Sequence, residues 1–186
     1  RILIFSKAPI PGHVKTRLCP PLTDQAASQV HRQLTTRTLK MACKEAICPV
    51  QLWCSPSSTH SFFTTLKENF PVTLEKQAGN NLGEKMHHAF CTSLQSAQHV
   101  ILIGSDSPSL SPEVLKNAIV ALKNHHDITL APALDGGYAL IGLNRPQQRL
   151  FKEINWGKQD VLTTTLKRIK TLKLNYYELP LQWDVD

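Results

Sequence analysis

Short apolar runs alternate with longer amphipathic stretches along this chain, and this alternation constrains the fold more than any other feature. Strand-like runs cover 2–5, 50–54, 72–75 and 99–104, and helix-like periodicity fills the intervals between them. Such alternation predicts an α/β protein, with a mostly parallel sheet between two layers of helices. Ligands of such sheets bind at the carboxyl ends of the strands. The loops that follow the strands are therefore where function is expected.

Helix starts are well marked in the sequence. Thr23 is a suitable N-cap for a long first helix, and we expect Ala27, Val30, Leu34 and Met41 to form its inner face. Further helices are predicted at 59–69, after Asn81, after Ser111 and at 159–170. At the start after Asn81, Glu84 lies three residues further on. At the start after Ser111, Pro112 occupies the first helical position. The run 99–104 is the most hydrophobic, which indicates a central strand buried on both faces.

The pattern changes in the last third of the chain. Two strand-like runs, 127–134 and 138–143, are joined by the tight turn 135–137, Asp-Gly-Gly. Such a turn between two strands is typical of a β-hairpin, so one antiparallel element is expected in the otherwise parallel sheet. A last strand is predicted at 174–179. No linker or repeat interrupts the chain, which favours a single domain over 1–186.

Composition excludes several classes of protein. The longest apolar runs are a few residues, far short of the ~20 that cross a bilayer. No secretory signal pattern is present, and the five cysteines form no C-x-x-C pair. We therefore expect a cytoplasmic protein with reduced thiols and no membrane insertion. The net charge of +7 favours an anionic partner, but aromatic residues are only 6% of the chain, so nucleic acid is not the expected partner.

The loop after the first strand is rich in cations. Lys7, Lys15 and Arg17 flank a bend shaped by Pro11 and Gly12. Fixed positive charge and close backbone approach are what a polyphosphate requires. The loop contains neither a G-x-G-x-x-G nor a P-loop motif. An exposed loop with ordinary surface charges remains the alternative.

Carboxylates follow the central strand and end the sequence. Asp106 comes directly after the strand 99–104, and Asp184 and Asp186 are spaced i, i+2, which points both to one side of an extended segment. Carboxylates together with substrate phosphates are typical ligands of Mg²⁺. The simpler alternatives are a turn capped by Asp106 and an acidic terminus.

Two glycine-containing segments have both a structural and a functional interpretation. The run Asp135-Gly136-Gly137-Tyr138 is a good hairpin turn that also lies at a strand end. The segment 79–84 contains Gly79, Asn81 and Gly83 and is a capped helix start. The backbone N–H groups of such a start are able to bind a nucleobase or a phosphate.

Taken in order, these motifs resemble a single family. They are Phe5-Ser6-Lys7-Ala8-Pro9 with Pro11-Gly12 and Lys15-Thr16-Arg17-Leu18, Leu82-Gly83-Glu84-Lys85-Met86, Gly104-Ser105-Asp106-Ser107-Pro108, Asp135-Gly136-Gly137-Tyr138 and Asp184-Val185-Asp186. The combination resembles the GT-A-like nucleotide-diphospho-sugar transferases, in particular an uncharacterised glycosyltransferase-like group with a domain of unknown function. It is similar, more distantly, to guanylyltransferases of the molybdenum-cofactor and phospholactate type.

The resemblance implies a GT-A fold, a nucleotide or nucleotide-sugar donor, a small-molecule acceptor, and Mg²⁺ or Mn²⁺ as cofactor. The nucleotide-binding residues that it implies are Lys7, Pro11, Gly12, Lys15, Arg17, Gly79, Asn81, Gly83 and Ser105. The metal ligands are Asp106 with Asp184 or Asp186. The acceptor-side residues are Asp135, Gly136, Gly137, Tyr138 and Trp156. The catalytic residues are Asp106, Lys15, Arg17 and Asp135.

The expected function is a metal-dependent transfer from a nucleotide-activated donor. In a glycosyl transfer the acceptor attacks the sugar and releases a nucleoside diphosphate. In a nucleotidyl transfer it attacks the α-phosphorus and releases pyrophosphate. The sequence does not separate the two, because both need the same cations and metal. A nucleotide-binding module without turnover is the alternative from another class.

Overall fold

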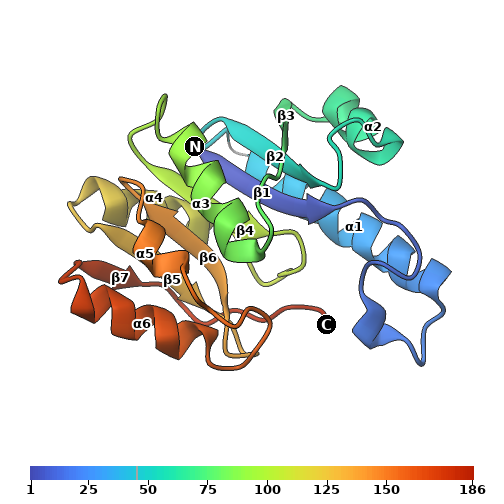
Figure 1. Cartoon of the computed structure of the whole chain (residues 1–186). Coiled ribbons are helices and arrows are strands. Elements are labelled where there is room, and N and C mark those ends of the chain that lie inside the picture. The colour runs from blue at the N-terminus through green and yellow to red at the C-terminus, as the bar shows by residue number, and fades with distance from the viewer. Residues whose placement is uncertain (45) are drawn as a thin grey trace.

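A computed structural model describes residues 1–44 and 46–186. Seven strands form one sheet in the order β3-β2-β1-β4-β6-β5-β7 (Figure 1). The strands are β1 (Ile2–Lys7), β2 (Val50–Ser55), β3 (Val72–Lys76), β4 (Val100–Gly104), β5 (Ile128–Pro132), β6 (Tyr138–Leu143) and β7 (Tyr176–Glu178). The helices are α1 (Asp24–Cys43), α2 (Ser61–Asn69), α3 (Leu82–Ser93), α4 (Pro112–Lys123), α5 (Gln148–Phe151) and α6 (Val161–Thr171), with a 3-10 turn η1 (Thr16–Leu18).

Among the strands of the described residues, β6 runs against all the others. It pairs antiparallel with β4 and β5, whereas the pairs β1 with β2, β1 with β4, β2 with β3 and β5 with β7 are parallel. The predicted mostly parallel sheet with one antiparallel hairpin is confirmed, and β4 is the central strand. The carboxyl ends of six strands therefore meet at one edge, together with the start of β6.

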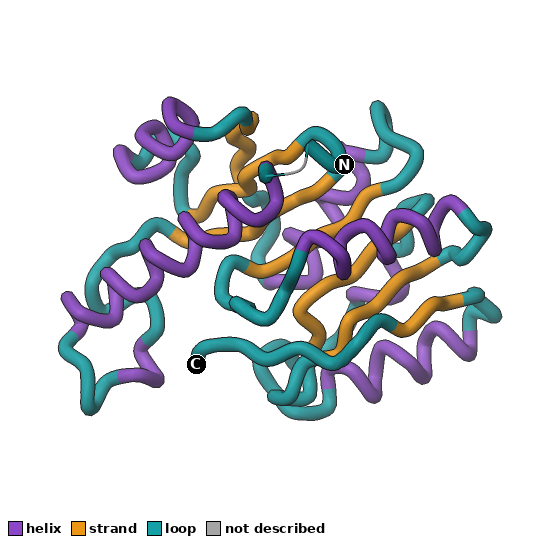
Figure 2. The backbone as a smooth tube through the Cα atoms, turned by 180° about the vertical axis from the view of Figure 1, so that it is seen from behind, coloured by secondary structure: helices purple, strands orange, loops and turns teal. Residues whose placement is uncertain are grey.

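Helices cover both faces of the sheet, which gives the predicted three layers. Helices α3, α5 and α6 lie in front of the sheet in Figure 1, and α1 and α4 lie on the opposite face, seen in Figure 2. Alternating residues of each strand supply the two cores. In β1, Ile2 and Ile4 enter the core with α1, α2 and α4, whereas Leu3 and Phe5 enter the core with α3, α5 and α6.

Local signals set the helix starts as expected. The side chains of Thr23, Asn81 and Ser111 each accept a hydrogen bond from the backbone N–H three residues on, and Pro112 is the first residue of α4. The short helix α5 was not predicted, because four residues are too few to show a period. None of the helices in the described part of the chain is long and apolar enough to cross a membrane.

The inner face of α1 differs from the prediction. Its buried residues include Ala27 but not Val30, Leu34 or Met41, and four of them are polar: Ser28, His31, Thr35 and Thr38. The last three lie along one stripe of the helix. These polar side chains lie against the ends of β1 and β4, where they form hydrogen bonds to strand-end groups. The predicted apolar stripe is wrong because polar residues occupy about half of the buried positions of this helix, so its apolar period does not mark the inner face.

Candidate active site

The cation-rich loop after β1 directs Lys15 into the molecule. Lys15 adopts a left-handed backbone conformation (φ 51°), and its side chain is only 5% exposed. Its ammonium donates to Asp106 Oδ2 at 2.8 Å, to Asp186 Oδ1 at 3.0 Å and to the Val185 carbonyl at 2.5 Å. One lysine thus joins the loop after β1, the loop after β4 and the last residues of the sequence.

The charge of Lys15 is stabilised by these partners. Burial alone would lower the pKa of its ammonium, but the carboxylates of Asp106 and Asp186 more than offset burial and raise that pKa. Arg17 donates to the other oxygen of Asp186 at 3.2 Å, and its side chain remains 64% exposed. Lys15 and Arg17 therefore place two cations side by side at Asp186, as a polyphosphate site requires.

A glycine at the end of β4 allows the Asp106 carboxylate to fold back toward the sheet. A Cβ at Gly104 would lie 2.7 Å from Asp106 Oδ1, so a side chain there would displace this carboxylate. The Asp106 carbonyl also accepts a hydrogen bond from the Val185 N–H at 3.0 Å. Asp106 therefore contacts the final segment directly through its backbone, and its side chain is linked to that segment through Lys15.

The segment 182–186 runs along the edge of the sheet at which the parallel strands end, and it finishes close to the loop after β1 (Figures 1 and 2). Gln182 forms a parallel bridge with Ala133. Ser109 Oγ donates to the Trp183 carbonyl at 3.1 Å and accepts from the Trp183 N–H at 3.0 Å. Ser107 Oγ donates to Asp184 Oδ1 at 3.2 Å. These contacts hold the terminal carboxylates in the site.

Three carboxylates converge there: one oxygen each of Asp135, Asp184 and Asp186 lies within 4.8 Å of the others. Burial, followed by the negative charges of Asp106 and Asp135, raises the pKa of Asp184 to about 6. Crowded hard oxygen donors of this kind fit Mg²⁺ or Mn²⁺. The predicted ligand Asp106 lies beside this group but pairs with Lys15, whereas Asp135, expected on the acceptor side, is a member of it.

The Asp-Gly-Gly segment is both a hairpin turn and part of the site. Asp135 Oδ1 accepts from the Gly137 N–H at 2.8 Å. Gly136 has a φ of 87°, and a Cβ there would overlap the Gln159 carbonyl. The two interpretations of this segment are thus compatible, because the turn geometry itself orients Asp135.

Aromatic residues form the opposite wall. The rings of Tyr138 and Trp156 meet edge to face, with centroids 6.5 Å apart. A Cβ at Gly83 would lie 2.9 Å from the Trp156 indole, so this glycine allows the indole to pack on the first turn of α3. Burial raises the pKa of the Tyr138 hydroxyl, which stays protonated.

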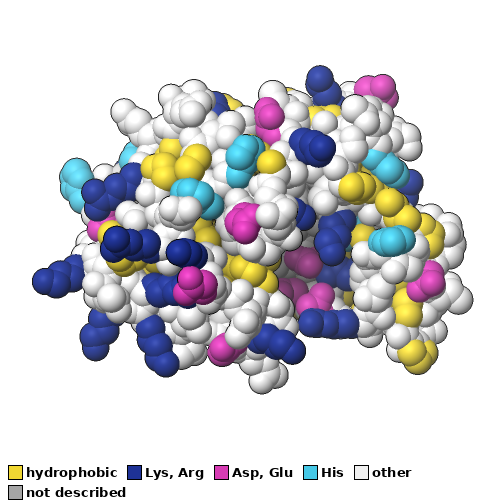
Figure 3. Space-filling model, viewed as in Figure 1, with side chains coloured by type: hydrophobic (Ala, Val, Ile, Leu, Met, Phe, Trp, Pro, Cys, Tyr) yellow, Lys and Arg dark blue, Asp and Glu magenta, His cyan; other side chains and the backbone are white. Residues whose placement is uncertain are grey.

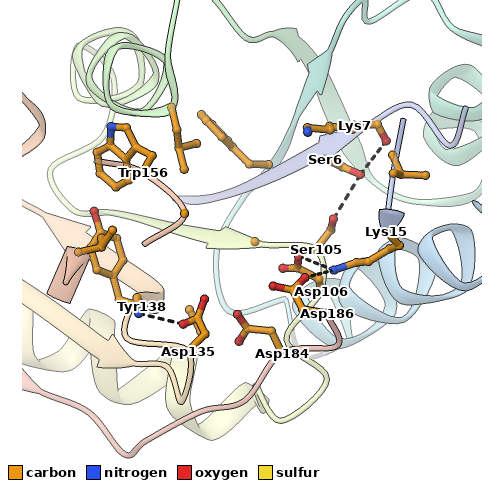
Figure 4. Close-up of a pocket in the computed structure, with 18 of the residues that line it drawn as sticks. Ser6, Lys7, Lys15, Ser105, Asp106, Asp135, Tyr138, Trp156, Asp184 and Asp186 are labelled. Atoms are coloured by element: carbon orange, nitrogen blue, oxygen red, sulfur yellow. Dashed lines mark hydrogen bonds and ion pairs between the residues drawn. The ribbon is translucent and has the colours of Figure 1, made fainter. Parts of the chain in front are cut away.

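These elements enclose a cavity of about 470 Å³. Figure 3 shows acidic side chains inside a hollow with Lys and Arg beside it. In Figure 4, Lys15, Asp106 and Asp186 lie on one side and Tyr138 and Trp156 on the other, with Asp135 and Asp184 between them. Its wall includes an apolar set: Phe5, Leu82, Met86, Leu102, Ile141 and Trp156. Charged and apolar walls in one cavity suit a ligand with phosphates and a flat or apolar body.

Most predicted residues line this cavity. They are Lys7, Lys15, Arg17, Ser105, Asp106, Asp135, Gly137, Tyr138, Trp156, Asp184 and Asp186. Others lie in the supporting turns and not in the lining: Pro11, Gly12, Gly79, Asn81, Gly83 and Gly136. Asn81 is the N-cap of α3, and Gly83 supports Trp156. The assignment of Gly136 to the acceptor side, and of the other five residues to nucleotide binding, stays a prediction.

Sequence reasoning missed His31 and Gln77, which also line the cavity. The Gln77 amide nitrogen donates to the carbonyls of Ser6 (3.3 Å) and Trp53 (2.8 Å), tying the end of β3 to β1 and β2. No local motif marks either residue. For His31, a polar residue within a predicted helix is the one signal in the sequence, and the predicted inner face of Ala27, Val30, Leu34 and Met41 does not include it.

Comparison with known proteins supplies the family. The sequence profile of a family described as "Uncharacterized protein conserved in bacteria (DUF2064)" matches residues 38–158. None of the curated proteins compared with the chain matches it. A solved structure of a candidate nucleotide-diphospho-sugar transferase from Desulfovibrio desulfuricans is 30% identical. The alignment covers 100% of this chain and 81% of that one, with a TM-score of 0.88.

More distant structures share the fold. A cytidylyltransferase from Leptospira borgpetersenii is 12% identical over 96% of this chain and 74% of its own, with a TM-score of 0.59. A CMP:2-keto-3-deoxy-manno-octonic acid synthetase, solved with CTP, is 6% identical over 97% and 90%, with a TM-score of 0.61. The fold is therefore that of the nucleotide-diphospho-sugar transferases, as the motifs indicate, and the chain belongs to the DUF2064 family of bacterial proteins.

Proposed function

We propose that this protein is a metal-dependent transferase that uses a nucleotide-activated donor, with glycosyl transfer from a nucleotide-diphospho-sugar as the reaction. The observation that carries the proposal is the placement of Lys15 and Arg17 against converging carboxylates in a cavity with an aromatic wall. The 30% identical structure, described as a candidate transferase of this type, supports it.

Each group has a role in this reaction. Lys15 and Arg17 bind the diphosphate and stabilise the charge that develops on the leaving group, which is typically worth a few kcal/mol per donor. Asp135, Asp184 and Asp186 would hold the Mg²⁺ or Mn²⁺, and Asp106, the ligand that the resemblance implies, lies beside them and pairs with Lys15. The metal, when bound, supplies charge neutralisation of the diphosphate. The acceptor binds along Asp135, Tyr138 and Trp156.

Nucleotidyl transfer is the second candidate, and the fold shared with cytidylyltransferases favours it. The same cations would then stabilise departing pyrophosphate instead of a nucleoside diphosphate. Analysis of the released product separates the two reactions. Pyrophosphate release would contradict glycosyl transfer, and nucleoside diphosphate release would contradict nucleotidyl transfer.

The proposal is tested by thermal unfolding against nucleoside triphosphates and nucleotide sugars, with and without Mn²⁺. A ligand at ~100 times its dissociation constant adds about 2.7 kcal/mol to the free energy of unfolding, a shift of several degrees. We expect such a metal-dependent shift in the wild type and its loss in Asp106→Asn. The control is Asp127→Asn, whose carboxylate pairs with Arg145 at 3.0 Å outside the cavity. A wild type that responds to none of these ligands would contradict the proposed function.

A further inference from the structure

The buried polar stripe of α1 lies directly beneath the candidate site. His31, Thr35 and Thr38 are at most 5% exposed and share one face of the helix. This face packs where β1 and β4 end, at Ser6, Lys7 and Ser105. Those residues begin the two loops that carry Lys15 and Asp106.

Hydrogen bonds connect the stripe to both strand ends. His31 Nε2 lies 2.8 Å from the Lys7 carbonyl and 3.4 Å from Ser6 Oγ. Thr35 Oγ1 lies 3.0 Å from Ser6 Oγ, and Ser105 Oγ donates to Ser6 Oγ at 3.4 Å. Thr38 Oγ1 donates to the Ser105 carbonyl at 3.4 Å. One helical face therefore contacts the first residues of the cation loop and of the Asp106 loop together.

The partners of His31 define its tautomer. A carbonyl oxygen only accepts hydrogen bonds, so the short contact to Lys7 requires a proton on Nε2. The other ring nitrogen, Nδ1, is buried with no hydrogen-bond partner among residues 1–44 and 46–186, and it carries a lone pair in the neutral ring. A proton added there would be a buried donor without an acceptor, near the positive charges of Lys7 and Lys15 and the negative charge of Asp106.

We propose that His31 is a positioning residue, which as a neutral Nε2–H imidazole fixes the Lys7 carbonyl and so sets the cation loop against the Asp106 loop. This inference rests on the proposed function, because its consequence is the binding of phosphate between Lys15 and the metal-binding carboxylates. His31 itself does not touch the phosphates; it acts through the backbone of Lys7 and the hydroxyl of Ser6.

The tautomer is tested on the unliganded wild type by nuclear magnetic resonance with ¹⁵N-labelled histidine, the His31 signal being assigned from the His31→Gln spectrum. We expect the Nε2–H form to persist well below pH 6.5, the ordinary pKa of histidine. An Nδ1–H tautomer, or an ordinary titration near pH 6.5, would overturn the proposal. This measurement needs no ligand, so it stands whether or not the proposed function holds.

The consequence is tested by calorimetric titration with pyrophosphate in the presence of Mg²⁺. His31→Leu removes the donor, and we expect binding to weaken ~10-fold, the size typical of outer-shell partners. His31→Gln places an amide N–H near the position of Nε2 and is expected to restore binding to within about threefold. Equal binding by the wild type and the leucine variant would overturn the positioning role.

Destabilisation by itself is controlled with Leu39→Ala. Leu39 is fully buried on the same helix, and its truncation costs about 2–5 kcal/mol but removes none of the hydrogen bonds of the stripe. We expect this variant to melt earlier and to bind magnesium pyrophosphate like the wild type. If it binds as weakly as His31→Leu, the effect belongs to helix stability and the proposal fails. If the wild type itself does not bind, the proposed function fails instead.

Discussion

Lys15 lies between carboxylates from distant parts of the chain, so its replacement has two expected effects. In Lys15→Met, Asp106 and Asp186 lose their buried partner. Because both carboxylates remain more than one third exposed, we expect a loss of about 1–3 kcal/mol in the free energy of unfolding, below the range for a fully buried pair. Phosphate affinity is expected to fall as well.

Arg17→Met is the matched comparison. Arg17 contacts the same Asp186, but its side chain is 64% exposed, and surface pairs are worth about 0–1 kcal/mol. Urea unfolding should therefore separate the two variants, while pyrophosphate titration should show weaker binding in both. Equal stabilities for the two would mean that burial of Lys15 contributes nothing.

His31 gives the protein a predictable acid sensitivity. Burial lowers the pKa of its imidazole, although the hydrogen bond to the Lys7 carbonyl opposes this. The unfolded chain therefore binds the proton more tightly than the folded protein does. The contribution of His31 to stability is complete above pH ~6.5 and is lost as the pH falls toward the lowered pKa.

The measurement is the free energy of unfolding in urea between pH 7 and pH 5. We expect His31 to contribute a decline of up to about 1.4 kcal/mol per pH unit in this range. The decline should be smaller in His31→Gln, which has no titrating group at this position. Parallel profiles for the two proteins would show that another group causes the acid sensitivity.

At the scale of elements, the loop between β4 and α4 holds the segment 182–186 in place. The reciprocal hydrogen bonds between Ser109 and Trp183 lie outside the carboxylate cluster, yet they fix the backbone that carries Asp184. We expect Ser109→Ala to weaken Mn²⁺ binding about 10-fold, because outer contacts that orient ligands have effects of this size.

Electron paramagnetic resonance of free Mn²⁺ measures this affinity directly. The control is Ser57→Ala, which also removes an exposed hydroxyl contact, to Thr59, far along the chain from the site. Ser57→Ala should bind Mn²⁺ like the wild type. Unchanged Mn²⁺ affinity in Ser109→Ala would show that this pair of hydrogen bonds does not position the carboxylates.

At the scale of the whole molecule, strands β1 and β2 are largely buried on both faces of the sheet. Cys54 in β2 has no exposed surface, and burial raises the pKa of its thiol to about 12. Thiolates, not thiols, react with alkylating reagents. We expect Cys54 to be modified only when the sheet opens globally, whereas the partly exposed Cys48 reacts in the native state.

Timed alkylation followed by mass spectrometry gives the rate for each cysteine. The Cys54 rate should match the rate of global unfolding measured in the same buffer, and it should rise with urea. If Cys54 were modified as fast as Cys48, β2 would open locally without global unfolding. The sheet near the carboxyl end of β2 would then be less stable than the rest of the fold.

The sequence by itself determined the α/β class, the antiparallel hairpin, the helix starts at Asn81 and Ser111, and the family. Each depends on local signals: the period of apolar residues, a cap within three residues, or a motif of a few residues. These signals also brought most of the site residues to one edge, because strand ends of a parallel sheet meet there.

Only the tertiary structure decided which charges meet and what supports them. Lys15 joins Asp106 and Asp186 across most of the chain, and Asp135 joins the terminal carboxylates. The buried role of His31 depends in the same way on the helix rotation that turns it toward Lys7. Such contacts are fixed by packing between distant segments, which the pattern of neighbouring residues does not encode.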